Sequence, residues 1–176
     1  MKIVIIHGNG GCTHTSVWIP WLKSELEKKN IKVLAHTMPD NYEAKASAWL
    51  PYMKEVLKCD ENTIVIGHSS GAVAAMRYAE QNKLLGSVLV GACYTDLDIE
   101  SERISGYYDE PWQWDAIKQN QQWIMLFASS DDPFIPITEA RHIHKNLGTE
   151  YHEFDDQGHF QDKDIPELLS VLLKKI

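Results

Sequence analysis

The 176-residue chain has no apolar run approaching the roughly 20 residues that a membrane-spanning helix needs. Positive charge is also scarce: 17 Lys and Arg oppose 25 Asp and Glu, and a net charge of −8 argues against a nucleic-acid partner. Three cysteines without a Cys-x-x-Cys pair predict reduced thiols. Because Met1 and Lys2 lead straight into a strand-like run, we expect no signal peptide and a cytoplasmic protein without a membrane partner.

The chain does contain a regular alternation of strand-like and helix-like segments. The predicted strands are residues 2–6, 31–36, 62–66, 85–90, 122–127 and 150–154. The predicted helices are residues 17–29, 44–57, 71–81, 112–119, 138–147 and 164–174. This pattern predicts an α/β fold, with a six-stranded, mostly parallel sheet and helices on both faces. We expect one domain spanning residues 1–176, with ligands at the carboxyl ends of the strands.

A Gly-x-Ser-x-Gly motif, Gly67-His68-Ser69-Ser70-Gly71, joins a β-branched run to an alanine-rich, helix-like segment. On a turn from a buried strand into a helix, such a motif lifts the central hydroxyl above the edge of the sheet. Glycine at both ends avoids collisions where the chain doubles back. We therefore predict that Ser69 is a nucleophile, with the amides of the helix N-terminus available to stabilise negative charge.

Downstream residues supply an acid and a base in the order that accompanies this motif. Asp132 follows an apolar strand-like run within an Asp-Pro-x-x-Pro turn, and Asp131 is the alternative acid. His159 follows the last predicted strand, where Gly158 lets the loop bend back over the sheet. We predict that His159 takes a proton from Ser69 and returns it to the leaving group, while Asp132 fixes the histidine tautomer.

The first predicted strand opens into a glycine-rich turn, His7-Gly8-Asn9-Gly10-Gly11. This turn predicts an oxyanion hole in which one backbone amide comes from Asn9, or alternatively Gly10, and the other from Ser70. The glycine spacing matches neither a P-loop nor a dinucleotide-binding loop, so we expect no nucleotide role.

The longest irregular connection runs from Gly91 to about Glu110, which is too short for a large lid domain but long enough to wall a pocket. Candidate lining residues are His68 of the motif and, above all, Tyr107 and Trp112, with Tyr94, Tyr108 and Trp114 beside them. Candidate contacts for a cationic substrate group are Asp96, Asp98, Glu100 and Glu102. The alternative is that these aromatic residues pack locally and that the carboxylates face water.

Further motifs extend the pattern along the chain: Met76-Arg77-Tyr78-Ala79-Glu80, Ser105-Gly106-Tyr107, Pro111-Trp112-Gln113-Trp114 and Gly158-His159-Phe160-Gln161. Together with the motifs above, they resemble the family of small serine hydrolases that includes retinoblastoma-binding protein 9 and its bacterial relatives. The resemblance runs nearly end to end and implies a minimal α/β-hydrolase fold. It also implies Ser69, Asp132 and His159 as a catalytic triad, action on small ester or amide substrates, and neither a cofactor nor a metal.

Two other functions stay open. Leu57-Lys58-Cys59-Asp60-Glu61 matches the Leu-x-Cys-x-Glu pattern of peptides that bind pocket proteins, so a protein-interaction module with a residual or inactive hydrolase site is one alternative. We expect Leu57 to belong to the core, which disfavours pocket-protein binding because release would need local unfolding. An acyltransferase or thioesterase using the same triad is the other alternative. The sequence leaves monomer and homodimer equally open.

Overall fold

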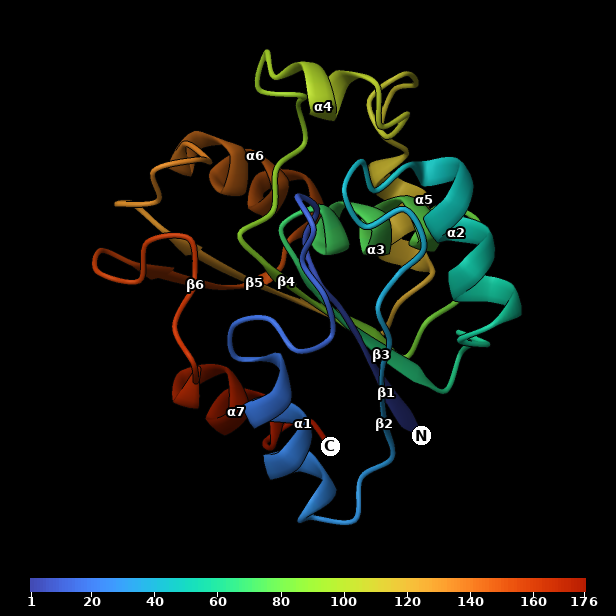
Figure 1. Ribbon diagram of the computed structural model, residues 1–176, viewed down its shortest axis with the longest axis vertical. Helices are drawn as coiled ribbons and strands as arrows, with labels where there is room; N and C mark the ends of the chain where they lie inside the picture. Colours follow the sequence, from blue (N-terminus) through green and yellow to red (C-terminus); the bar gives the residue numbers. More distant parts are fainter.

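The computed structural model describes residues 1–176 and contains a six-stranded sheet flanked by helices (Figure 1). The strands are β1 (Lys2–Ile6), β2 (Val33–Ala35), β3 (Thr63–His68), β4 (Gly86–Val90), β5 (Trp123–Ser129) and β6 (Glu150–Phe154). The helices are α1 (Ile19–Glu27), α2 (Ala46–Glu55), α3 (Ser70–Ala79), α4 (Glu100–Arg103), α5 (Trp114–Gln119), α6 (Ile137–Leu147) and α7 (Pro166–Leu172). No helix is both long and apolar enough to cross a membrane.

All neighbouring strands are parallel, in the order β2-β1-β3-β4-β5-β6. The chain leaves β1 for β2 on one side and later returns to place β3 on the other side. The register pairs Ile6 at the end of β1 with Gly67 near the end of β3. The crevice outside the carboxyl ends of strands at such a reversal is the usual ligand site of an open α/β sheet.

Both faces of the sheet are covered, which explains why consecutive residues of β1 are apolar. Ile3 and Ile5 pack in one core with α1 and α7, whereas Val4 and Ile6 pack in the other core with α2, α3, α5 and α6. Figure 1 shows the same division of the helices into two groups. Helix α3 is the most enclosed, since all ten of its residues are buried, and its alanines let it approach the sheet closely.

The predicted fold class is confirmed: six parallel strands carry helices on both faces. Two local predictions need correction. The helix predicted from Trp112 begins at Trp114, and the connection after β4 contains the short helix α4, which the sequence analysis did not predict. A four-residue helix has too few residues for a clear apolar periodicity, so its pattern was not visible.

Candidate functional site

The turn between β3 and α3 holds Ser69 in a strained backbone conformation, with φ 54° and ψ −120°. Close backbone approaches on both sides explain the flanking glycines. A Cβ at Gly67 would lie 2.3 Å from the carbonyl oxygen of Gly71, and a Cβ at Gly71 would lie 2.4 Å from that of Ile6. The turn therefore leaves no room for side chains at either glycine, and Ser69 follows directly after the end of β3.

Asp132 and His159 are brought together by the loops after β5 and β6. His159 Nδ1 lies 2.7 Å from Asp132 Oδ2, and both side chains are almost fully buried. The other carboxylate oxygen, Asp132 Oδ1, accepts the backbone amides of Phe134 and Ile135 at 2.9 and 3.0 Å. A carboxylate held in this way accepts the Nδ1 proton of His159 and leaves Nε2 as the nitrogen that can take up a proton.

The serine and the histidine line the same cavity but make no hydrogen bond to each other in this conformation. Hydrogen bonds of this kind are often long in ligand-free sites and tighten when substrate binds. The ring of Phe134 meets the ring of His159 edge-on, with centroids 5.2 Å apart. The exposed Phe134 therefore covers one side of the imidazole.

Asp131, the alternative acid, makes different contacts. Its Oδ1 accepts the hydroxyl of Ser129 at 2.5 Å and the amide of Gly158 at 2.8 Å. The Ser129 hydroxyl oxygen in turn accepts the amide of Gln157 at 3.1 Å. The hydrogen bond from the Ser129 hydroxyl lowers the pKa of Asp131 most, and the hydrogen bond from the Gly158 amide lowers it further. Asp131 thus ties the turn that carries Asp132 to the loop that carries His159.

The glycine-rich turn after β1 lies beside the serine, because a Cβ added at Gly8 would be 3.2 Å from Ser69 Cβ. The Asn9 amide donates to no acceptor in the chain, whereas the Gly10 amide donates to the carbonyl oxygen of Tyr42 at 3.1 Å. Ser70 is the first residue of α3, so its amide has no acceptor within the helix. Of the two candidates in this turn, Asn9 is the one with a free amide.

Two buried histidines hold these loops in place. His7 Nε2 accepts the amide of Met38 at 2.9 Å, so the ring donates from Nδ1 to the carbonyl oxygen of Gly8 at 2.6 Å. His68 Nε2 lies 2.8 Å from the carbonyl oxygen of His159. Burial lowers the pKa of His7, and burial lowers the pKa of His68 to about 4. Both rings are therefore neutral, and their hydrogen bonds hold the loops in position.

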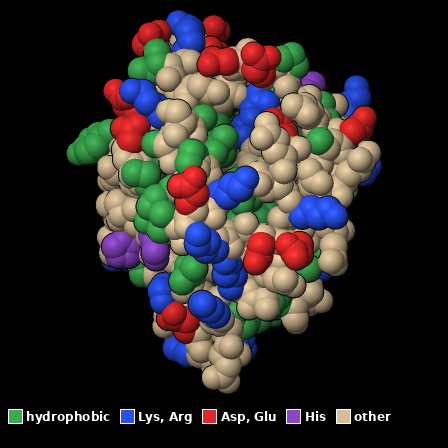
Figure 2. Space-filling model, turned by 90° about the vertical axis from the view of Figure 1, so that its right-hand side faces the viewer, with side chains coloured by type: hydrophobic (Ala, Val, Ile, Leu, Met, Phe, Trp, Pro, Cys, Tyr) green, Lys and Arg blue, Asp and Glu red, His purple; other side chains and the backbone are tan.

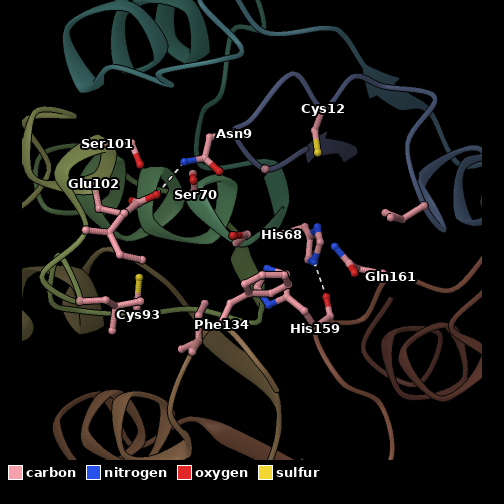
Figure 3. Close-up of a pocket in the computed structure, with 16 residues that line it drawn as sticks. Asn9, Cys12, His68, Ser70, Cys93, Ser101, Glu102, Phe134, His159 and Gln161 are labelled. Atoms are coloured by element: carbon pink, nitrogen blue, oxygen red, sulfur yellow. Dashed lines mark hydrogen bonds between the residues drawn. The ribbon is translucent and has the colours of Figure 1, made fainter. Parts of the chain in front are cut away.

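The cavity at this edge of the sheet has a volume of about 280 Å³ and suits a small molecule. Figure 3 shows the labelled side chains around it, with the hydrogen bond from His68 to the His159 backbone at its centre. The predicted residues that line it are Asn9, His68, Ser69, Ser70, Glu102 and His159. The others are Gly8, Cys12, Val17, Cys93, Leu97, Ile99, Ser101, Phe134, Ile135 and Gln161.

Glu102 is the single carboxylate among the cavity residues, and neither Lys nor Arg lines the cavity. Its Oε1 accepts the side-chain amide of Asn9 at 2.6 Å, and its Oε2 lies 3.4 Å from the hydroxyl of Tyr108. Burial raises the pKa of Glu102. The sequence analysis named Glu102 among four loop carboxylates, and the structure places Asp96, Asp98 and Glu100 outside the cavity lining.

The prediction that Tyr107 and Trp112 line the pocket was wrong. Tyr107 is fully buried in the core, and its carbonyl oxygen accepts the Arg77 Nε at 2.6 Å. The Arg77 guanidinium lies 3.7 Å from the centre of the Trp112 ring, whose indole nitrogen donates to Tyr94 at 2.8 Å. The loop wraps around Arg77 because a buried guanidinium must be given acceptors.

Several cavity residues were missed by sequence reasoning. Phe134, Ile135 and Gln161 follow the predicted acid and base by two or three positions, and this adjacency was a usable signal. Leu97 and Ile99 had no such signal, because isolated apolar residues in an irregular loop show no periodicity. Tyr94, Tyr108 and Trp114 are absent from the cavity lining.

The sheet order, the strained serine turn and the Asp-His pair define an α/β hydrolase. The sequence profile of the family described as serine hydrolase matches residues 3–165, and the chain belongs to this family. It is 46% identical over 175 residues to serine hydrolase RBBP9 of Rattus norvegicus, covering 97% of this chain and 93% of the relative. The predicted resemblance is thereby confirmed.

Bacterial relatives extend the comparison. The chain is 25% identical over 167 residues to the putative hydrolase YdeN of Bacillus subtilis, covering 90% of this chain and 85% of the relative. The crystal structure of the B. subtilis ydeN gene product superposes with a TM-score of 0.90 at 23% identity, covering 98% and 97% of the two chains. Est1E of Butyrivibrio proteoclasticus with ferulic acid superposes with a TM-score of 0.78 at 13% identity, covering 99% and 87%. These structures share the fold with this chain.

Proposed function

We propose that this hydrolase cleaves small esters or amides through a triad of Ser69, His159 and Asp132. The observation that carries the proposal is the pairing of His159 with Asp132 at 2.7 Å beside the cavity that Ser69 lines. The pairing sets the histidine tautomer with Nε2 unprotonated, which is the form that a general base needs.

In this mechanism the Ser69 oxygen attacks the substrate carbonyl carbon while His159 Nε2 takes the hydroxyl proton. The negative charge that develops on the carbonyl oxygen is stabilised by the amides of Asn9 and Ser70. Collapse of the tetrahedral intermediate breaks the bond to the leaving group, which takes the proton from His159. Water then attacks the acyl-serine, gives its proton to His159 and releases the acid, and that proton returns to Ser69.

The interaction-module alternative finds little support in the structure. Leu57 and Cys59 are buried, with 1% and 7% of their surface exposed, and burial raises the pKa of Cys59 to about 12. A partner that reads the Leu-x-Cys-x-Glu pattern in extended form would need this segment to unfold. No specific observation favours acyl transfer over hydrolysis.

The test is hydrolysis of a panel of p-nitrophenyl esters and aminoacyl aminocoumarin amides by wild type and Ser69→Ala. We expect the variant to lose about 10³-fold or more in kcat, because removing one triad member leaves only binding and the oxyanion hole. A fluorophosphonate probe should label wild type and spare the variant. Equal turnover by both proteins would exclude Ser69 as the nucleophile.

A further inference from the structure

Phe160, the residue directly after the proposed base, has a strained backbone. Its φ is +52°, in the left-handed region that residues with a Cβ rarely adopt, and its bulky side chain is buried. A second strained residue, Val17, has φ +47° and lines the cavity. Left-handed backbone is especially unfavourable for a β-branched residue such as valine. Strain of this kind persists only where the surrounding structure fixes the backbone, and it is typical of functional sites.

One hydrogen bond connects the two strained positions. The indole Nε1 of Trp18, the residue after Val17, donates to the carbonyl oxygen of Phe160 at 3.1 Å, across 142 positions of the chain. In Figure 1, helix α1, which follows Trp18, lies beside helix α7, which follows Phe160. One strained residue thus precedes the donor and the other carries the acceptor. The contact is therefore kept against the conformational preference of the backbone on both of its sides.

This hydrogen bond lies in the interior of the protein. Trp18 is fully buried, and the ring of Phe160 meets that of Phe154 edge-on in the core formed with α1 and α7. On the surface shown in Figure 2, by contrast, side chains of both charges intermingle in contact with water, which weakens the interactions between them. The carbonyl oxygen of Phe160 accepts no other hydrogen bond in the chain. Loss of the Trp18 donor would therefore leave it without a partner.

The position of His159 depends on the backbone that carries it, because its imidazole has a single hydrogen-bond partner in the chain, Asp132. The carbonyl oxygen of His159 lies 2.8 Å from His68 Nε2, a contact that Figure 3 shows beside the cavity. The next carbonyl oxygen, that of Phe160, is the one that Trp18 holds. The Trp18 ring also meets the His68 ring edge-on, with centroids 5.7 Å apart. Trp18 therefore contacts the partners of both carbonyl groups at the base.

We propose that Trp18 is a positioning residue for His159, an inference that rests on the proposed hydrolase function. The Nε1 hydrogen bond fixes the strained Phe160 and thereby the backbone from which the imidazole projects. That backbone places His159 Nδ1 at 2.7 Å from Asp132 Oδ2 at the edge of the cavity. Without the hydrogen bond, the Phe160 backbone relaxes and carries the imidazole away from Asp132. A displacement of about 1 Å can cost roughly 100-fold in rate.

The test removes the Nε1 hydrogen of Trp18. Trp18→Phe keeps an aromatic ring and loses the donor. Replacing Trp18 by 3-benzothienylalanine puts sulfur in place of the N–H and keeps the outline of the indole, so it decides the matter if Trp18→Phe does not fold. We expect kcat for the best p-nitrophenyl ester to fall about tenfold, with KM changed by less than about twofold. The proton NMR signal of the hydrogen bond between His159 Nδ1 and Asp132 should shift or broaden, because the imidazole moves.

The matched control is Tyr78→Phe, which also removes a buried donor from a backbone carbonyl oxygen. The Tyr78 hydroxyl donates to Cys59 at 2.8 Å and lies near the end of α3 that is remote from Ser69. This variant should lose a comparable free energy of unfolding in urea while keeping kcat and the NMR signal. If the Trp18 variants behave in the same way, Trp18 is merely structural and the proposal is overturned. A lower kcat with an unchanged NMR signal would overturn it as well, since the imidazole would still be in place.

Ser69→Ala separates this inference from the function on which it rests. If Ser69→Ala cleaves the ester as fast as wild type, the proposed triad itself fails. If Ser69→Ala is inactive while the Trp18 variants match Tyr78→Phe in kcat and in the NMR signal, the triad stands and only the positioning role of Trp18 is refuted.

Discussion

A single added methyl group at Gly71 is expected to disrupt the serine turn. The Cβ of an alanine there would lie 2.4 Å from the carbonyl oxygen of Ile6 and 2.7 Å from that of His7. Both neighbours are backbone atoms, so no side chain can rotate away and either α3 or the end of β1 must shift. Such overpacking costs about 3 kcal/mol, whereas alanine gains about 1 kcal/mol over glycine within a helix. The net loss in the free energy of unfolding is about 2 kcal/mol.

This loss corresponds to a fall of roughly 4–8 °C in melting temperature for a chain of this size. Urea unfolding followed by tryptophan fluorescence measures the loss in the free energy of unfolding. The kcat of the variant should also fall at least about tenfold, because Ser69 moves with α3. The control is Gly148→Ala at the end of α6, where φ is +64° and only the left-handed backbone opposes a side chain. That variant should lose about 1 kcal/mol and keep its kcat. Wild-type stability and turnover in Gly71→Ala would refute the steric argument.

Two further predictions concern Asp131 and the buried histidines. Asp131→Ala removes the acceptor of the Gly158 amide and should lower kcat about tenfold with little change in KM. Asp131→Asn keeps an acceptor oxygen and should retain most of kcat. Steady-state kinetics measure both effects, and equal rates in the wild type and the two variants would exclude a positioning role for Asp131. The free energy of unfolding should fall as the pH drops from about 6.5 towards 4, because His68 stays neutral in the folded chain while the unfolded histidine takes up a proton. Urea unfolding at pH 7 and at pH 5 measures this fall, and His68→Gln should reduce the difference in unfolding free energy between the two pH values. If the variant shows a difference as large as that of the wild type, His68 is not the source of the pH dependence.

The sheet was predictable from sequence because its strands are short, continuous apolar runs bounded by polar turns. All six predicted strands exist, and β1 and β6 have the predicted bounds. The edge strand β2 is shorter than predicted, Val33–Ala35 instead of 31–36, because only these three residues are in register with β1. The order of the strands could not be read from periodicity, which describes each segment but not its neighbours.

The pocket wall was harder to predict than the serine turn. Arg77 lies in an alanine-rich helix and would ordinarily face water. In the folded chain it is buried and draws the carbonyl oxygens of Tyr107, Glu110 and Pro111 around its guanidinium. Which loop residues face the cavity is decided by this long-range arrangement, so aromatic content alone pointed to the wrong side chains. The residues of the predicted triad and oxyanion hole follow strand ends and remain predictions for mutagenesis to test.

Five of the sixteen cavity residues come from one short stretch of the loop after β4, namely Cys93, Leu97, Ile99, Ser101 and Glu102. The serine turn, the acid turn and the histidine loop lie elsewhere in the chain, so residues of this stretch can change without altering those three segments. Exchanging it between relatives should transfer substrate preference while leaving the reaction chemistry intact.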